Sequence, residues 1–305
     1  MAVATVGSGR APGKGRDADG PPAARSRAAW LLLTPGLAWL VLFFATPLFF
    51  LFGTSLQTRV PDGDIGEFEQ TFSWSNYGEA LRTYWPQFLR SFEYAAIATV
   101  LALAIAYPMA YFIAHKAGRM RNVLLVLVVA PFFASFILRT IAWRQILGED
   151  SILVRAMHAV HLIPDGFAVT NSPLAVVAGI TYNFLPFMTL PLYSSLERID
   201  PRLIEAGGDL YASPFTTFRK VTFPLSMPGV VAGTLLTFIP AAGDYVNADL
   251  LGRPPATTMI GNVVQSRFFK IVDYPTAAVL SFLLMAAILV LVLLYVRKAG
   301  TEELL

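Results

Sequence analysis

The sequence predicts an all-α integral membrane protein with six transmembrane helices, and three observations support this fold class. Of the 305 residues, 55% are apolar and only 14% are charged, whereas soluble domains carry about 25% charged residues. The mean hydropathy is +0.58. Six apolar stretches reach the length of about 20 residues that a helix needs to cross the hydrocarbon core of a membrane. An ordinary soluble enzyme is therefore excluded.

The first predicted span follows two arginines, Arg25 and Arg27, as the apolar core of a signal peptide would. Its apolar run is longer than the about 7–15 residues of a signal sequence, and no clear small-residue cleavage site follows, so a retained helix is expected. The six predicted spans are Trp30–Leu56, Tyr94–Ala114, Val123–Trp143, Leu174–Leu196, Met227–Val246 and Thr276–Val296.

Positive charge is unevenly distributed between the two sides of the predicted membrane domain. Fourteen of the 23 Lys and Arg residues lie in residues 1–29, in the loops 115–122 and 197–226, and in the tail after residue 296. Loops rich in Lys and Arg remain on the cytoplasmic side of a membrane. Both termini are therefore expected in the cytoplasm, as an even number of spans requires.

The two ends of the chain are predicted to be tails. Residues 1–29 are largely Gly, Ala, Pro and Arg, so a disordered cytoplasmic tail is expected, either solvated or in contact with anionic membrane lipid. Residues 299–305 are expected to form a second cytoplasmic tail, which leaves residues 30–298 as one six-span domain. The net charge is only +3, and without a basic cluster this does not indicate binding to nucleic acid.

Residue types needed for several kinds of catalysis are missing from the sequence. It has no cysteine, which excludes disulfides, thiolate zinc sites and a cysteine nucleophile. His158 and His161 lie near Glu149 and Asp165, but their spacing matches no common metal site, and an exposed loop is expected instead. The sequence contains no Walker A motif, no dinucleotide-binding motif and no nucleophile elbow. No catalytic residue, metal or cofactor is predicted in this chain, and any ATP must be hydrolysed by another chain.

The predicted cytoplasmic loop between the fourth and fifth spans combines two helix starts with small residues. Asp200 and Pro201 begin a helix, with the aspartate as N-cap and the proline in the first turn. Small residues at 206–208 let another surface approach the backbone closely, and Ser213 and Pro214 start a second short helix. We therefore expect two short cytoplasmic helices that dock on a cytosolic partner and are tied to the fifth span through a proline-containing segment.

This loop resembles the signature of the permease subunits of bacterial ABC importers, which reads Glu-Ala-Ala, three residues, Gly, nine residues, Ile-x-Leu-Pro. Glu205 and Ala206 match its beginning, and Pro224 falls at the expected distance. Val221 and Phe223 replace Ile and Leu conservatively. The resemblance implies a type I ABC importer permease fold, with this loop as its coupling helices.

The loop departs from the signature at two positions. Gly207 stands where the third alanine is usual, and Tyr211 stands where the glycine is usual. Because a left-handed glycine is not easily replaced by tyrosine, we expect the turn between the two helices to be altered. Within about residues 200–218 and the proline that follows, the resemblance assigns the coupling role to Glu205, Ala206, Gly207, Asp209, Leu210, Ser213 and Pro224.

Three further blocks extend the resemblance over roughly residues 30–298, to the first permease subunit of the spermidine/putrescine importers. They are Pro131–Trp143, Asn183–Tyr193 and Phe238–Val246. The resemblance implies a polyamine permease in the bacterial inner membrane. Its implied partners are a second, homologous permease, two copies of a cytosolic ABC ATPase that holds ATP and Mg, and an extracytoplasmic substrate-binding protein.

Acidic residues near the outer end of the fifth span are candidates for the substrate pathway. Asp244 is followed by Tyr245 and Asp249, and this group suits a polycation that enters from outside. The alternative is that Asp244 caps a helix or pairs with Arg253 or Arg267. These two interpretations remain open at the level of sequence.

Three other features near the span ends are further candidates. Glu93 opens the second span, where an acidic residue also complements the helix dipole. Trp143 and Tyr182 offer rings for cation–π contacts with ammonium groups, or simply pack within the bundle. Arg139 lies about 25 Å beyond Asn122 in a continuous helix, which places it at the outer boundary of the membrane.

Prolines and small residues mark special positions within the predicted spans. Proline removes a helical hydrogen bond, which is tolerated where neighbours or a cavity satisfy the freed carbonyl. Small residues permit close contact between transmembrane helices, and we expect one group to face the second permease. The prolines are Pro131, Pro186, Pro191 and Pro240, and the small residues are Gly179, Ser194, Ser195 and Gly233.

Alternatives to a polyamine permease are a related permease for thiamine, ferric iron, sulfate or molybdate, an ion-coupled secondary transporter, or an integral membrane enzyme. A carrier of oxyanions is expected to place positive charge near the substrate, whereas the block around Asp244 is acidic. A secondary transporter or a membrane enzyme has no need of a loop shaped for a cytosolic partner.

Overall fold

The computed structural model describes residues 22–61, 63–160 and 169–299. His161 and the predicted tails over residues 1–21 and 300–305 lie outside the described residues. The chain divides into two units, residues 1–50 and residues 51–305, and each is described by itself.

The described part of the first unit is a helix that contains most of the first predicted span. It consists of α1 (Pro22–Leu40), a π-helical turn (Val41–Ala45) and the first half of α2 (Thr46–Ser55). The helix begins at Pro22, so residues 22–29 are helical where a disordered tail is expected. These residues are rich in Ala and Arg, which have high helix propensity.

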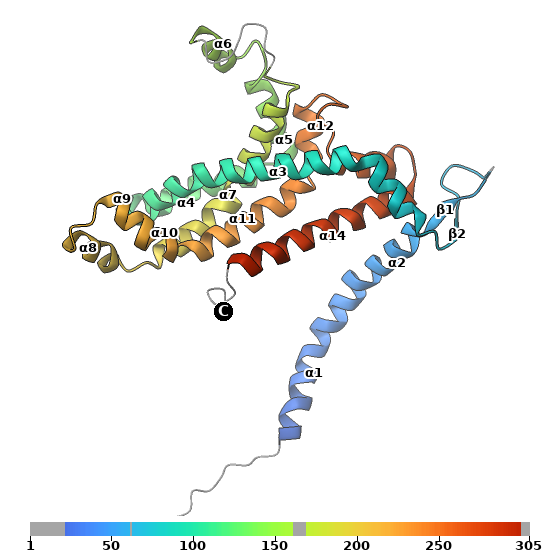
Figure 1. The fold of residues 1–305 in the computed structure, drawn as a ribbon, viewed down its shortest axis with the longest axis horizontal. Coiled ribbons are helices and arrows are strands. Elements are labelled where there is room, and N and C mark those ends of the chain that lie inside the picture. Colours follow the sequence, from blue (N-terminus) through green and yellow to red (C-terminus); the bar gives the residue numbers. More distant parts are fainter. Residues whose placement is uncertain (1–21, 62, 161–168, 300–305) are drawn as a thin grey trace, which may run out of the picture. The chain divides into compact units, whose positions relative to one another are not determined.

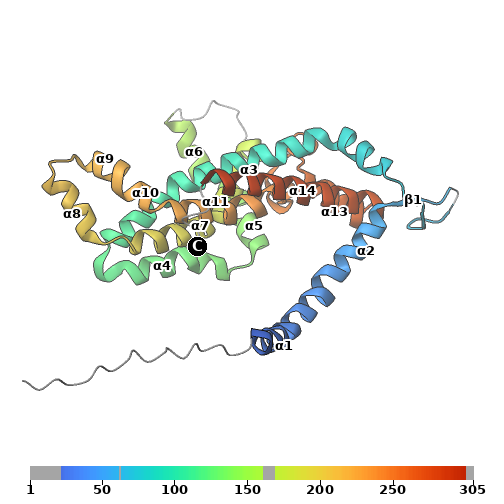
Figure 2. The ribbon, with the colours of Figure 1, turned by 60° about the horizontal axis from the view of Figure 1, so that its bottom comes forward.

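The second unit is organised around three long helices that lie side by side (Figures 1 and 2). They are α3 (Ser75–His115), α7 (Pro173–Glu197) and α11 (Met227–Ala242). Span four is confirmed as α7, which starts where the Ser172 hydroxyl accepts the N–H of Ala175. The second span is longer than the predicted Tyr94–Ala114 because its helix already begins at Ser75.

An alanine ladder runs along α3 at the contact with α7. Alanines recur there every three or four residues, the spacing of one helix face. Small residues let helix backbones come close together, which is how helices associate in a membrane. The fully buried alanines of this ladder are Ala95, Ala98, Ala102, Ala106 and Ala110.

Small residues also bring α11 and α12 (Val246–Leu251) onto α7. A Cβ added to Gly233 of α11 would meet the Sδ of Met188 at 2.8 Å, and one added to Gly179 of α7 would meet Asn247 Oδ1 at 2.7 Å. The prediction that these glycines face a second permease is therefore wrong. They pack inside the chain, and of that predicted face only Ser194 is exposed.

The third predicted span is not one straight helix. A 3₁₀ turn (Gly118–Met120), α4 (Arg121–Val129) and a second 3₁₀ turn (Ala130–Phe133) lead to a bend of 97°, after which α5 (Phe136–Ile146) begins. This corrects the continuous span expected over Val123–Trp143. Pro131 has no N–H to donate to the preceding turn, and the helical path is interrupted at Ala134 and Ser135, which have ψ values of 149° and 135°.

The fifth span begins at Met227 as predicted, but its helix ends before the predicted Val246. A 64° bend separates the segment Pro214–Leu225 from α11, and α11 ends at Ala242, so Asp244 lies in a short break before α12. The sixth span is confirmed as α14 (Tyr274–Ala299).

The remaining elements are short. Strands β1 and β2 form an antiparallel hairpin that pairs Thr58 with Glu69, a small exception to the predicted all-α fold. These elements are β1 (Gln57–Arg59), β2 (Phe68–Gln70), α6 (Ile152–Ala159), α8 (Pro201–Asp209), α9 (Pro214–Thr217), a π-helical turn (Phe218–Thr222), α10 (Phe223–Leu225) and α13 (Ile260–Phe269).

The number of possible spans agrees with the predicted fold class. Within the described residues, four helical stretches are long and apolar enough to cross a membrane, and there are up to six when each of the two bent pairs counts as one span. The unbent stretches are Leu32–Ser55, Ser75–His115, Pro173–Glu197 and Tyr274–Lys298.

Gly179 tests the close packing of α7 directly. We expect Gly179→Ala to lower the free energy of unfolding by about 1–3 kcal/mol, because the new methyl group overlaps Asn247 and Leu251. Gly78→Ala on α3 is the matched control, since nothing lies within 4 Å of its added Cβ. Thermal unfolding of the purified protein in detergent measures both. Equal unfolding midpoints for the two variants would contradict the packing described here.

Candidate functional site

The predicted pair of short helices is present at the end of the bundle where α11 begins, as α8 and α9 (Figure 1). Asp200 caps α8 by accepting the backbone N–H of Arg202 at 2.9 Å. Ser213 caps α9 by accepting the N–H of Thr216 at 3.2 Å. Each helix therefore starts at the residue that its sequence pattern predicts.

The turn between α8 and α9 keeps the left-handed conformation although it has no glycine. Tyr211 has a φ of 58°, so the expectation of an altered turn is not supported. The N–H of Tyr211 bonds to the carbonyl of Gly208, and the N–H of Ala212 bonds to that of Gly207. These bonds close the end of α8 and offset the steric cost of about 1–2 kcal/mol for a side chain in this region. The Tyr211 ring is fully exposed.

Gly207 is required by the contact between the two short helices. A Cβ at this position would lie 2.8 Å from Oγ1 and 2.9 Å from Cγ2 of Thr217. The alanine usual at this position of the signature would therefore overlap the Thr217 side chain. The departure at 207 is explained by the threonine at 217, a relationship that the sequence alone does not reveal.

The outer surface of α8 and α9 carries large apolar side chains together with acidic ones. Of the predicted coupling residues, Gly207 is half-buried and the others are exposed. Sequence reasoning missed three apolar members, Leu203, Tyr211 and Phe215, which are 49%, 99% and 70% exposed. We call the exposed set the coupling surface: Leu203, Glu205, Ala206, Asp209, Leu210, Tyr211, Ser213 and Phe215.

The bend between this segment and α11 is held against α3. Ser226 lies at the bend, fully buried, and its hydroxyl is 2.7 Å from that of Tyr107. The rings of Phe218 and Phe223 lie 5.6 and 6.0 Å from the Tyr107 ring. Pro224 itself is exposed. Tyr107 therefore attaches the segment Pro214–Leu225, which follows the coupling surface, to α3. Sequence reasoning did not identify this role.

At the other end of α11, Asp244 is part of a buried polar cluster. It is 6% exposed, and its Oδ1 accepts the N–H of Asn247 at 2.9 Å while its Oδ2 accepts the Asn247 side-chain amide at 2.6 Å. Asn183 of α7 donates to Asn247 Oδ1 at 3.0 Å and to the hydroxyl of Thr140 on α5 at 3.2 Å. We call these four residues the Asp244 cluster.

The Asp244 cluster settles which neighbours the carboxylate has. Its bond to the Asn247 N–H is the geometry of a helix cap, one of the two alternatives that the sequence left open. The pairing with arginine is wrong, because in the described part of the chain the ion pairs do not include Asp244. Arg253 is exposed.

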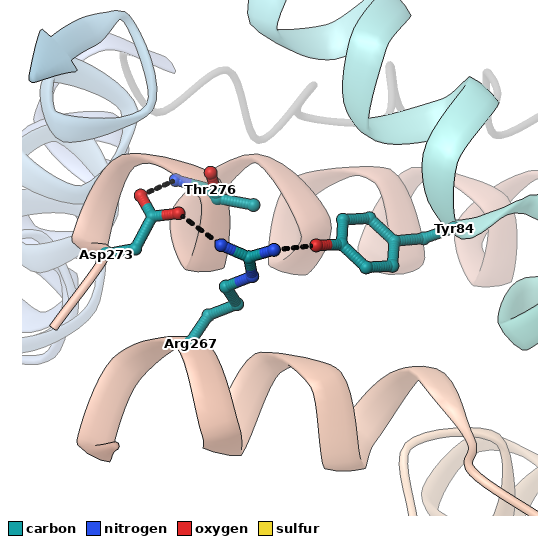
Figure 3. A network of polar contacts seen from close by, with 4 residues as sticks. All are labelled: Tyr84, Arg267, Asp273 and Thr276. Carbon is teal, nitrogen blue, oxygen red and sulfur yellow. Dashed lines mark hydrogen bonds and ion pairs between the residues drawn. The ribbon is translucent and has the colours of Figure 1, made fainter. Parts of the chain in front are cut away.

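Arg267, the other predicted partner, is bound elsewhere. Figure 3 shows its guanidinium between Asp273 and Tyr84, and its Nη1 donates to Asp273 Oδ2 at 3.0 Å. Its Nη2 donates to the Tyr84 hydroxyl. The other Asp273 oxygen accepts the N–H of Thr276 in the first turn of α14. This network ties α13 and α14 to the extended part of α3.

The remaining predicted pathway residues are only partly brought together. Trp143 and Tyr182 stack edge to face with ring centroids 5.1 Å apart, which is the packing alternative. Tyr245 follows Asp244 and is exposed, as are Asp249 and Glu93. No group of three or more potential metal ligands occurs among the described residues.

The fold and the coupling surface define a membrane permease of the ABC type. Residues 106–299, more than half of the chain, match the family described as binding-protein-dependent transport system inner membrane component, and the chain belongs to this family. Members are transport subunits rather than enzymes.

Similar proteins of known function indicate which kind of ABC permease this chain resembles. The chain is 36% identical over 264 residues to the spermidine/putrescine transport system permease protein PotB of Escherichia coli (strain K12), covering 86% of this chain and 94% of the relative. It is 34% identical to PotB of Haemophilus influenzae, covering 85% and 90%. The predicted similarity to the polyamine permeases is confirmed.

Solved structures show the same fold. A bacterial ABC transporter involved in the import of the acidic polysaccharide alginate has a chain with a TM-score of 0.65 and 16% identity, which covers 90% of this chain and 96% of that chain. A bacterial alginate ABC transporter in complex with an alginate pentasaccharide-bound periplasmic protein gives a TM-score of 0.66 and 14% identity, with coverage of 90% and 95%. The predicted type I ABC permease fold is thereby confirmed.

Proposed function

We propose that this chain is a permease subunit of an ATP-driven importer that moves spermidine and putrescine into the cytoplasm. The observation that carries the proposal is the similarity to PotB, a spermidine/putrescine permease, over 86% of the chain. That similarity extends through the coupling segment and through the Asp244 cluster. The acidic residue of this cluster also favours a cationic cargo over sulfate or molybdate. Thiamine and ferric iron remain the alternatives that an uptake experiment must exclude.

The coupling surface is suited to a cytosolic ATPase. Its exposed apolar side chains resemble the residues that anchor a protein interface. Leaving such a group in contact with water is unfavourable. The side chains are Leu203, Leu210, Tyr211 and Phe215. Two ATPase copies would hold ATP and Mg, since this chain offers no nucleotide motif. Movement of the ATPases would pass through the bend at Ser226 into α11.

The proposed assembly contains two further partners. A second, homologous permease completes the pathway, and an extracytoplasmic binding protein delivers the substrate to the side opposite the coupling surface. In this arrangement both termini lie in the cytoplasm of a bacterial cell. The excess of Lys and Arg in the loops that include the coupling segment supports this orientation.

Uptake of radiolabelled spermidine and putrescine tests the proposed substrate. Cells that contain the gene should accumulate polyamine faster than cells from which it is deleted, in a strain without another polyamine importer. Labelled thiamine and ferric iron are measured in parallel. Equal polyamine uptake in both strains would remove the proposed substrate, and a deficit in only one of the parallel solutes would reassign it.

Glu205 tests the coupling role. It is exposed on α8, so Glu205→Ala should preserve folding and membrane insertion while it weakens contact with the ATPase. We expect uptake to fall by about tenfold, which is a loss of about 1.4 kcal/mol. Glu149→Ala, an exposed glutamate outside the coupling segment, is the control. Wild-type uptake and substrate-stimulated ATP hydrolysis in Glu205→Ala would show that coupling does not involve this residue.

Asp244 tests the cationic-substrate hypothesis. A carboxylate in a partly desolvated site pairs strongly with an ammonium group, and truncating such a pair costs roughly 2–5 kcal/mol. We therefore expect Asp244→Asn to lower uptake more than tenfold, whereas Asp150→Asn, an exposed aspartate beyond the end of α5, should have little effect.

Thermal unfolding separates this role from capping. Asparagine still accepts the N–H of Asn247 but places an amide against the Asn247 side chain, so some loss of stability is expected. A fall in uptake with the unfolding midpoint nearly unchanged supports substrate contact. Normal uptake would leave Asp244 with the capping role alone.

A further inference from the structure

An apolar cavity of about 360 Å³ lies between α3, α4 and α7. Its walls include Phe112 of α3, Leu124 and Val128 of α4, and Leu185 of α7. Arg139, beyond the bend that follows α4, also lines it. Because Leu124 is in the first turn of α4 and Arg139 follows its end, the cavity runs along the whole of this helix.

Arg139 places one cationic group in this apolar lining. Its Nη1 donates to the carbonyl of Pro131 at 3.1 Å, and its guanidinium lies 4.7 Å from the ring centre of Phe132 and 5.8 Å from that of Phe136. Its Nε is buried and has no hydrogen-bond partner. The ion pairs of the described residues involve other arginines, so Arg139 has no anionic partner there.

With the stretch Gly118–Phe133 along the membrane normal, the bend that precedes Arg139 comes near one boundary of the membrane. The helical stretch Gly118–Phe133 combines the nine residues of α4 with two 3₁₀ turns, and together they rise about 27 Å. For a helix along the membrane normal, this nearly spans the hydrocarbon core of roughly 30 Å. The bend of 97° then separates this stretch from α5, which carries Arg139.

The chemistry of the cavity selects its occupant. A polyamine would be repelled by the guanidinium, so the cavity is unsuited to the proposed substrate. An uncharged apolar helix would fill the walls but leave the charge of the Arg139 guanidinium without an anionic partner, which is unfavourable. An anion with a long apolar tail suits both the guanidinium and the apolar walls. Its phosphate accepts hydrogen bonds from the guanidinium, and its acyl chain lies against the walls.

We propose that Arg139 and the cavity between α3, α4 and α7 form a binding site for an anionic phospholipid. The phosphate binds the Arg139 guanidinium near the bend, and one acyl chain extends along α4 toward Leu124. The bound lipid fills the space beside the bend that no described side chain occupies. The site shares no residue with the coupling surface or with the Asp244 cluster, although Arg139 directly precedes Thr140 of that cluster.

Native mass spectrometry of the full chain, in the complex in which it is isolated from cells, tests this site. After delipidation the complex is titrated with palmitoyl-oleoyl phosphatidylglycerol, and with the matching phosphatidylcholine as the zwitterionic comparison. We expect Arg139→Gln to weaken phosphatidylglycerol binding about tenfold, the loss expected for one charge-assisted hydrogen bond. Arg144→Gln, an exposed arginine on the same helix, should bind as the wild type does.

A second variant keeps Arg139 and removes the space for the chain. Val128→Phe fills the cavity wall and should weaken phosphatidylglycerol binding to a similar extent, which tests the site even if Arg139→Gln fails to assemble. Three results would each overturn the proposal: equal lipid binding by Arg139→Gln and Arg144→Gln, unchanged binding by Val128→Phe, or full displacement of the lipid by excess inorganic phosphate, which would indicate a site for a free anion.

Discussion

The close approach of α3, α7 and α11 is the constraint on which the other features of the second unit depend. Lipid tails are as apolar as leucine, so helices in a membrane associate through tight packing rather than through the hydrophobic effect. The alanine ladder of α3 and the contact of Gly233 with Met188 remove bulk where the backbones meet. Because the three helices are held this closely, the bends and breaks of the chain occur at their ends. The three helices thus form a frame that positions the irregular segments.

The chain bends before α11 and breaks after it. Polar side chains from neighbouring helices form hydrogen bonds at both places. At its start, the Ser226 hydroxyl meets Tyr107 of α3. At its end, Asp244 and Asn247 meet Asn183 of α7. Hydrogen bonds of this kind replace the water that irregular backbone would otherwise need inside a membrane. The same frame therefore supports the segment next to the coupling surface and the buried cluster at the far end.

Patterns that are local in the sequence predicted local structure well. The caps at Asp200 and Ser213 place α8 and α9 correctly, and long apolar runs locate α7 and α14. Contacts between residues that are far apart in the chain could not be predicted from the sequence. Asn183 and Asn247 are 64 positions apart and uncharged, so neither carries a pattern that would link it to Asp244. Composition likewise cannot distinguish a straight span from one bent by 97°, although a proline inside it marks where the bend occurs.

The uninterrupted form of α11 has a mechanical consequence. Its 16 residues make a rod about 24 Å long, with the coupling segment at one end and Asp244 just beyond the other. A tilt of about 5° at the first end displaces the second by about 2 Å. Hydrogen bonds tolerate only a few tenths of an ångström around their usual length. A rod of this length therefore acts as a lever, and it converts a small rotation beside the coupling surface into the loss or gain of whole hydrogen bonds at the far end.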